Sequence, residues 1–200
     1  MIGKNVSRET EERLSHYAAL LKKWNPRINL VSRASLSDLW VRHVEDSAQL
    51  HDLAAHPVTH WADIGSGGGF PGLVIAILAR ETGSPARVTL VESDARKSAF
   101  LRTVVRETGL AATVITARIE ETEPLAADIV SARALADLPT LLGFAARHLG
   151  PGGTALFPKG ATWQQEISDA QSKWQFSHRV DKSRTDPAAV ILRVTGVSRA

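Results

Sequence analysis

The sequence predicts an α/β protein with a mostly parallel sheet that is covered by helices on both faces. From residue 61 onward, short apolar runs typical of strands alternate with longer runs of helical periodicity. Such alternation favours a parallel sheet, because a parallel connection crosses over a sheet face. The predicted strands are 61–64, 87–92, 112–117, 128–132 and 153–159, and the predicted helices are 71–82, 94–109, 136–149 and 161–172.

Two further strand-like runs close the chain, at 174–180 and 188–194. The segment between them, DKSRTDP, is rich in turn formers and too short for a crossover helix. We therefore expect an antiparallel hairpin at one edge of the sheet, which brings the predicted sheet to seven strands.

Two helices precede the first strand, at 6–24 and 36–53. Ser7 is expected to cap the first helix, and Asn25-Pro26 to end it. Ser35 and Asp38 form a potential capping box for the second helix. We predict a helical cap over 1–57 and an α/β body over 58–200, together forming one compact domain.

The composition is that of a globular protein, with 200 residues, 44% apolar and 22% charged. The absence of cysteine excludes disulfides, thiolate nucleophiles and Cys-ligated zinc, and no metal site is expected. The sequence has neither a secretory signal nor an apolar run of membrane-spanning length, so we expect a cytoplasmic protein. We also expect it to be a monomer. A net charge of +3 permits a polyanionic partner without requiring one.

The stretch WADIGSGGGFPG (61–72) places a glycine-rich turn between the first strand and its helix, where a cofactor commonly binds. A Walker A loop is excluded because no Lys-Ser or Lys-Thr follows Gly72. A dinucleotide fingerprint can be matched at Gly67, Gly69 and Gly72. That match begins three residues beyond the strand, however, and places Pro71 beside its last glycine.

Counted from the strand end, the loop has a D-x-G-x-G-x-G form at Asp63, Gly65, Gly67 and Gly69. This form resembles the first motif of S-adenosylmethionine-dependent methyltransferases, in which the glycines lie against the amino acid part of the cofactor. Glu92 ends the second strand, where an acid is expected to bind ribose hydroxyls. Both NAD and S-adenosylmethionine carry that ribose, but the leading acid and the terminal hairpin favour the methyl donor.

The absence of two features from the sequence narrows the range of methyl acceptors. Methylation at carbon 5 of a pyrimidine needs a cysteine, and exocyclic amines are usually served by a proline-rich loop where this chain has SARAL (131–135). A ring nitrogen such as guanine N7 needs orientation rather than a base. Arg133 and Lys159 lie at the carboxyl ends of predicted strands and could donate to guanine O6, leaving N7 free, so we predict both as catalytic.

Several motifs together resemble the RsmG (GidB) family of bacterial methyltransferases, from about residue 15 to 160. They are KWNPRINLVS (23–32), VRHVEDS (41–47), DIGSGGGFPG (63–72), ARIEE (117–121), SARAL (131–135) and PKG (158–160). The resemblance implies a class I methyltransferase fold with a Rossmann-like seven-stranded sheet after short helices. It also implies S-adenosylmethionine as cofactor and N7 of a guanine in 16S ribosomal RNA of the small subunit as acceptor.

The resemblance further implies cofactor contacts at Gly65, Phe70, Ile119, Glu120 and Arg133. We also expect His43, Asp46 and Ser47 to brace the helical cap against the glycine loop. Two alternatives remain open at this point. One is a small-molecule or protein methyltransferase with the same cofactor fold, and the other is a nicotinamide-dependent oxidoreductase on a similar sheet.

Overall fold

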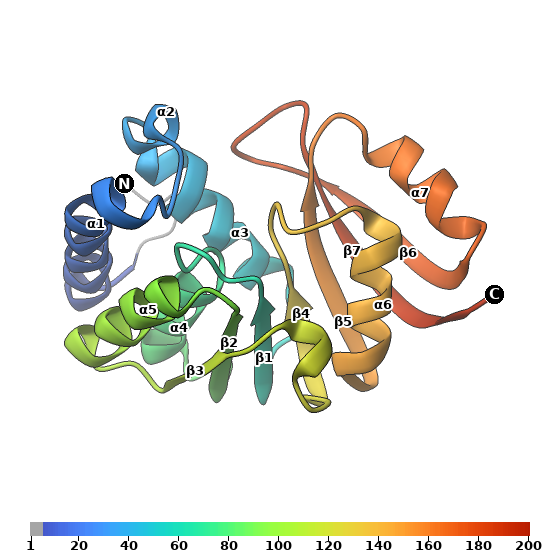
Figure 1. The fold of residues 1–200 in the computed structure, drawn as a ribbon, viewed down its shortest axis with the longest axis horizontal. Helices are drawn as coiled ribbons and strands as arrows, with labels where there is room; N and C mark the ends of the chain where they lie inside the picture. The colour runs from blue at the N-terminus through green and yellow to red at the C-terminus, as the bar shows by residue number, and fades with distance from the viewer. Residues whose placement is uncertain (1–5) are drawn as a thin grey trace.

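A computed structural model describes residues 6–200 and contains a seven-stranded sheet in the order β3-β2-β1-β4-β5-β7-β6 (Figure 1). Strands β1 to β5 run parallel, and β7 runs antiparallel to both β5 and β6. The predicted parallel sheet with an antiparallel edge hairpin is confirmed. The strands are β1 (His60–Ile64), β2 (Arg87–Glu92), β3 (Ala112–Thr116), β4 (Ala127–Ser131), β5 (Leu149–Lys159), β6 (Trp174–Lys182) and β7 (Val190–Arg199).

The strand order reverses between β1 and β4. The chain moves outward from β1 through β2 to β3, then returns to place β4 on the other side of β1. At such a switch point the two crossovers diverge and leave a crevice beyond the carboxyl ends of the strands. The last residues of β1, β2 and β4 therefore meet at one edge of the sheet.

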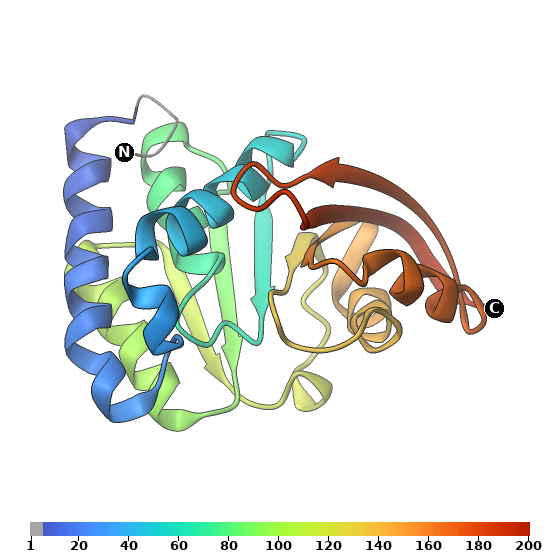
Figure 2. The same ribbon diagram turned by 90° about the horizontal axis from the view of Figure 1, so that it is seen from above.

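Helices cover both faces of the sheet (Figure 2). Successive strand residues point to opposite faces, so Trp61 packs into one core while Ala62 and Ile64 pack into the other. The first core also takes α4 (Gly72–Thr82) and α5 (Ala95–Thr108), and the second takes α6 (Leu138–His148) and α7 (Trp163–Gln171). These four helices agree with the sequence predictions to within two residues at each end.

The first helix, α1 (Arg8–Ile28), begins at the predicted Ser7 cap but does not stop before Pro26. The predicted end at residue 24 is wrong, because the helix continues for about one more turn and ends at a C-cap formed by Asn29. Asn29 adopts a left-handed conformation, and its N–H donates to the carbonyl of Asn25. The side-chain amide of Asn25 also exchanges two hydrogen bonds with the backbone of Val31, at 2.9 and 3.1 Å.

The single helix predicted over 36–53 is also wrong. The chain forms α2 (Arg33–Leu36), a π-helix, η1 (Trp40–Glu45), and α3 (Asp46–Leu53). Ser32, rather than Ser35, caps α2 by accepting the N–H of Ser35 at 3.2 Å, so the Ser35–Asp38 box does not form. The wider π turn is not encoded in apolar spacing, which made a continuous helix the simpler prediction.

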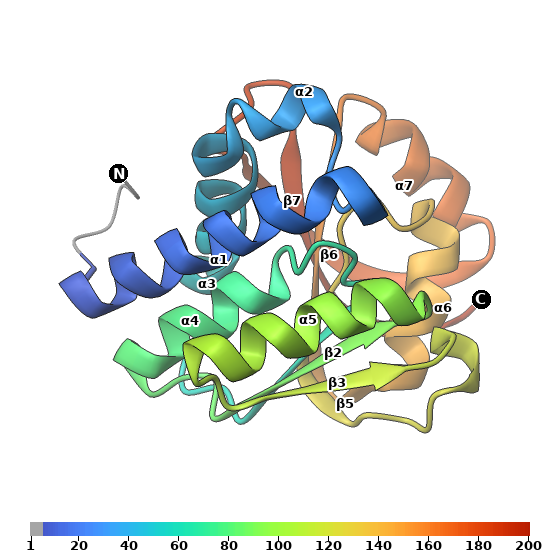
Figure 3. The same cartoon turned by 60° about the vertical axis from the view of Figure 1, so that its left-hand side comes forward.

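The N-terminal helices pack directly on the α/β body. Figure 3 shows α1 lying across α4 and α5, and its buried Leu14, Tyr17 and Leu21 belong to the same core as those helices. The division of the chain at residue 57 stays a prediction. Residues 1–5 of the predicted helical cap lie outside those that the structure describes. Within residues 6–200, no helix combines the length and apolar character needed to cross a membrane.

Candidate active site

The glycine loop that follows β1 depends on backbone conformations that other residues rarely adopt. Gly65, Gly67 and Gly69 have φ values of +66°, +54° and +95°, all in the left-handed region. A Cβ atom on Gly65 would also lie 2.6 Å from Leu135 Cδ1. The loop backbone can therefore turn tightly and come close to a ligand.

Asp63 lies beneath this loop and is completely buried. Its Oδ2 accepts the N–H of Gly72 at 3.2 Å, and its Oδ1 accepts the hydroxyl of Ser131 at 2.7 Å. Burial raises the pKa of Asp63 to about 6, against the opposing effect of these hydrogen bonds. Asp63 does not line the cavity described below, so it supports the loop rather than reaching the predicted cofactor position.

Gly69 also lies outside the cavity lining. A Cβ atom there would lie 2.3 Å from Leu73 Cδ1 and 2.9 Å from the hydroxyl of Tyr17, so this glycine makes room for packing beneath the loop. The hydroxyl of Tyr17 donates to the carbonyl of Gly68 at 2.6 Å, which ties α1 to the loop. Sequence reasoning missed Tyr17, because its position opposite the loop depends on how α1 packs.

A cavity of about 820 Å³ opens beyond the carboxyl ends of β1, β2 and β4. The structure brings most of the predicted cofactor residues together around it, namely Gly65, Gly67, Phe70, Glu92, Ile119, Glu120 and Arg133. We call this space the first cavity. Its volume suits a ligand of cofactor size.

The carboxylate of Glu92 is held at the end of β2 by backbone groups. Its Oε2 accepts the N–H of Gly67, and its Oε1 accepts the N–H of Asp94, both at 2.8 Å. Each oxygen retains a lone pair that a ligand hydroxyl could use. The predicted ribose contact is therefore compatible with the position and orientation of Glu92.

Ile119 and Glu120 belong to a single turn of 3₁₀ helix, η2 (Ile119–Glu121), that follows β3. Ile119 is buried while Glu120 is exposed, and both line the first cavity. The pair thus offers one apolar and one polar group at the same wall of the first cavity.

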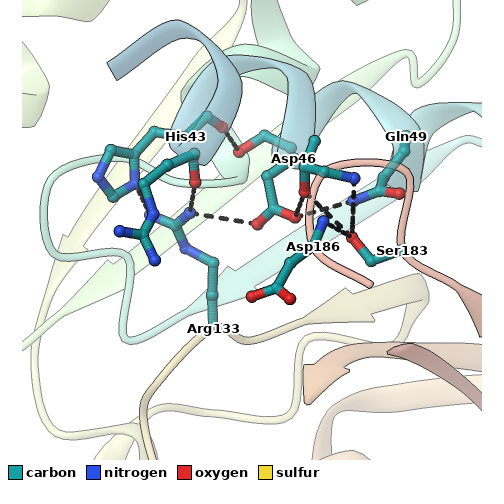
Figure 4. A network of polar contacts seen from close by, with 9 residues as sticks. His43, Asp46, Gln49, Arg133, Ser183 and Asp186 are labelled. Carbon is teal, nitrogen blue, oxygen red and sulfur yellow. Dashed lines mark hydrogen bonds and ion pairs between the residues drawn. The ribbon is translucent and has the colours of Figure 1, made fainter. Parts of the chain in front are cut away.

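Arg133 follows β4 and reaches across to the helical cap (Figure 4). One guanidinium nitrogen, Nη1, donates to the carbonyl of Arg42 at 3.1 Å and to Asp46 Oδ2 at 3.4 Å. The other, Nη2, donates to Nδ1 of His43 at 2.6 Å. Phe70 lies 5.1 Å from the guanidinium carbon, within the range of a cation–π contact. Arg133 is therefore fixed from several sides.

His43 connects the helical cap to the glycine loop, as predicted. Its ring stacks on Phe70 with centroids 4.8 Å apart. Asp46 instead bonds to Arg133 and Thr185, and the hydroxyl of Ser47 donates within its own helix to the carbonyl of His43. The expectation that all three residues brace the loop is thus right only for His43.

Lys159 does not line the first cavity. Its ammonium donates to Glu166 Oε2 at 2.7 Å and to the carbonyl of Ala136 at 2.9 Å, and its side chain is 7% exposed. It lines a second cavity, also of about 820 Å³, beside the first. The two cavities share Arg42, Arg133, Ala134 and Ala136. Arg133 therefore lines both cavities, whereas Lys159 lines only the second.

Comparisons with known proteins agree with this geometry. Residues 10–189 match the model of the GidB family, described as rRNA small subunit methyltransferase G. Proteins named ribosomal RNA small subunit methyltransferase G are 59% identical in Ruegeria pomeroyi, over 98% of this chain and 95% of the relative, and 53% identical in Rhodospirillum centenum, over 96% and 87%.

Solved structures show the same fold at low sequence identity. A TehB-like SAM-dependent methyltransferase from Corynebacterium glutamicum superposes with a TM-score of 0.58 at 14% identity, covering 94% of this chain and 100% of that one. M. jannaschii TYW2 in complex with AdoMet gives 0.56 at 15% identity, covering 79% and 76%. These likenesses confirm the predicted class I methyltransferase fold. The family match over most of its length shows that the chain belongs to the GidB family of small-subunit ribosomal RNA methyltransferases.

Proposed function

We propose that this enzyme transfers the methyl group of S-adenosylmethionine to N7 of a guanine in 16S ribosomal RNA of the small ribosomal subunit. Family membership supports the methyltransferase reaction, the methyl donor and the small-subunit RNA. The acceptor atom N7, which the family resemblance implies, is the finer part of this proposal. The observation that carries it is the position of Arg133, which forms a common wall of two adjoining cavities at the switch point of the sheet.

The first cavity fits the methyl donor. Gly65 lines this cavity, and its left-handed φ of +66° together with the close packing of Leu135 leaves no room for a larger residue there. We propose that the backbone of the loop holds the amino acid part of the cofactor and that Glu92 binds its ribose. Ile119 and Glu120 would flank the adenine. When bound, the cofactor supplies an electrophilic methyl group.

The reaction would form a bond between N7 and the methyl carbon while the carbon–sulfur bond breaks. The electron pair of that bond remains on sulfur, which becomes a neutral thioether, and the positive charge passes to the guanine. N7 carries a free lone pair, so the enzyme has to align the two reactants but need not remove a proton. This chemistry therefore requires no general base.

The surroundings of His43 support a mechanism without a base. Burial, then the charges of Arg133 and Arg42, lower the pKa of His43 to about 4. Its Nδ1 already accepts a hydrogen bond from Arg133. We therefore assign His43 to positioning Arg133 and Phe70.

Arg133 is our principal catalytic residue. Its Nε–H has no recorded partner within residues 6–200 and could donate to O6 of the guanine, which would leave N7 free. Lys159, predicted to share this role, is already paired with Glu166. We propose that Lys159 contributes by fixing the wall of the second cavity. We further propose that the enzyme acts as a monomer in the cytoplasm, where its RNA substrate is found.

The direct test is to incubate the protein with small ribosomal subunits and labelled S-adenosylmethionine, then map N7-methylguanosine in the RNA. We expect one labelled guanine, and a label on another base or another ring position would contradict the proposal. Turnover with a metabolite mixture but not with subunits would favour a small-molecule methyltransferase. Calorimetry with S-adenosylmethionine and with NAD tests the remaining alternative, because binding of NAD alone would indicate an oxidoreductase.

A further inference from the structure

The second cavity is enclosed by parts of the chain that are far apart in sequence. Its walls come from the η1 region, from the end of β5 at Pro158–Gly160, and from the loop between β6 and β7. We call this loop, residues 183–189, the hairpin loop. Figure 2 shows it lying against the helical cap. Arg133 lines both cavities.

The hairpin loop is firmly attached to the helical cap. Asp46 Oδ1 accepts the hydroxyl of Thr185 at 2.8 Å, and Gln49 Oε1 accepts the N–H of Arg184 at 2.9 Å. Within the loop, the hydroxyl of Ser183 accepts the N–H of Asp186 at 3.3 Å (Figure 4). Because Asp46 also binds Arg133, the hairpin loop and the proposed reaction centre are both held by Asp46.

Four carboxylates line the second cavity, and two of them are neutralised by cations. Asp46 is paired with Arg133, and Glu166 with Lys159. Asp38 and Asp186 have no ion-pair partner in the part of the chain that the structure describes. Of these two, only Asp186 lies on the hairpin loop.

Asp186 keeps hydrogen-bonding capacity for a ligand. Its Oδ1 accepts the N–H of Ala188 at 2.9 Å, and among residues 6–200 no partner is recorded for Oδ2. This local bond fixes the orientation of the carboxylate. An ionised carboxylate is purely an acceptor and can take two parallel hydrogen bonds. It therefore suits a ligand edge with two neighbouring donors.

Guanine carries such an edge. N7 and O6 lie on one side of the base, whereas N1–H and the 2-amino group lie on the other. If N7 points past Arg133 into the first cavity, the edge with the donors faces the second cavity. Adenine has a lone pair at N1 and no 2-amino group, so a carboxylate at this place would repel it.

We propose that Asp186 determines the specificity for guanine by accepting hydrogen bonds from N1–H and the 2-amino group of the acceptor base in the second cavity. This inference rests on the function proposed above and adds to it the residue that selects the base. Hydrogen bonds to charged groups are worth enough that replacing Asp186 by Asn should lower kcat/KM about 10- to 100-fold.

The experiment compares Asp186→Asn with the matched variant Asp38→Asn, a carboxylate on the same cavity that also lacks a cation partner. Each enzyme is assayed on small subunits assembled with guanine or with inosine at the position that the wild type methylates. Inosine keeps N1–H and N7 but lacks the 2-amino group. We expect the wild type to lose efficiency on inosine, and the loss caused by Asp186→Asn to be smaller on inosine than on guanine. Asp38→Asn should stay within about threefold of wild type on both substrates.

Calorimetry with S-adenosylmethionine checks that Asp186→Asn leaves the first cavity intact. A kcat/KM of Asp186→Asn equal to that of the wild type would overturn the inference. It would also be overturned if inosine lowered kcat/KM equally in the wild type and in Asp186→Asn, or if only Asp38→Asn lost efficiency. In each of those cases N7-methylguanosine formed by the wild type leaves the proposed function standing. If the wild type forms none, the proposed function fails and this inference fails with it.

Discussion

The guanidinium of Arg133 donates from Nη2 to Nδ1 of His43 at 2.6 Å. Because Nδ1 acts as the acceptor, the neutral ring of His43 carries its proton on Nε2. A second cation beside that ring would be unfavourable, which agrees with a pKa near 4. The pair thus combines a permanently charged arginine with a permanently neutral histidine at physiological pH.

The first prediction concerns Arg133. Replacement by Ala should lower turnover at least ~100-fold, because alignment of the acceptor is lost. It should also lower the free energy of unfolding by about 1–3 kcal/mol, since His43 and Asp46 lose a buried donor. Arg193→Ala is the control, because it breaks a similarly buried ion pair with Asp181 and lines neither cavity. Equal turnover in the two variants would contradict the role of Arg133.

The second prediction concerns the pH dependence that Asp63 produces. Its folded-state pKa is raised to about 6, so between about pH 4 and 6 the folded protein binds more protons than the unfolded chain. The stabilisation from protonated Asp63 is complete below its unfolded pKa and is lost as the pH rises through 6. Asp63→Asn does not titrate there. The difference in unfolding free energy, wild type minus variant, should fall by on the order of 1 kcal/mol from pH 5 to pH 7.5.

Urea unfolding at the two pH values measures this difference directly. Other titrating groups are common to both proteins and cancel in the comparison. A difference that stays constant or rises with pH would show that the carboxyl of Asp63 is not held in the environment described here.

The third prediction concerns Gly72, the first residue of α4. A Cβ atom there would lie 2.2 Å from Leu90 Cδ2 and 2.7 Å from Asp63 Oδ2. Gly72→Ala should therefore reduce stability by about 1–3 kcal/mol through overpacking. Gly143→Ala is the matched control inside α6, because its Cβ would meet nothing closer than Trp174 at 3.5 Å. We expect thermal unfolding to give a clearly lower Tm for Gly72→Ala than for Gly143→Ala.

The fourth prediction concerns Tyr17. Tyr17→Phe removes a buried hydrogen bond to the carbonyl of Gly68 and should lower the free energy of unfolding by about 1–3 kcal/mol. Because Gly68 lines the first cavity, affinity for S-adenosylmethionine should fall as well. Unfolding curves and calorimetry measure the two effects. Unchanged affinity would show that the loop keeps its shape without α1.

The sequence was informative where the signal is local. Strand alternation predicted the sheet, and the glycines predicted a tight loop at its edge. Lys159 was placed correctly at the carboxyl end of its strand, but its ion pair with Glu166 on α7 depends on how α7 packs. Most of the residues predicted to bind the cofactor line the first cavity, because they follow directly from the ends of neighbouring parallel strands.

The remaining parts of the site depend on distant contacts. Asp46 and Thr185 are 139 residues apart, and no spacing in the sequence indicates their hydrogen bond. The π-helical turn at η1 could not be predicted either, because its residues have the composition of an ordinary α-helix. The second cavity, which both segments enclose, could not be seen from the sequence.

The glycine loop is held by the protein itself, from α1 through Tyr17, from β2 through Glu92 and from β1 through Asp63. Its conformation is preorganised, so an incoming cofactor does not have to order it. Association then loses little conformational entropy, and more of the contact energy remains as affinity. We expect the loop backbone to superpose closely between ligand-free and ligand-bound states, with rearrangement on binding confined to side chains.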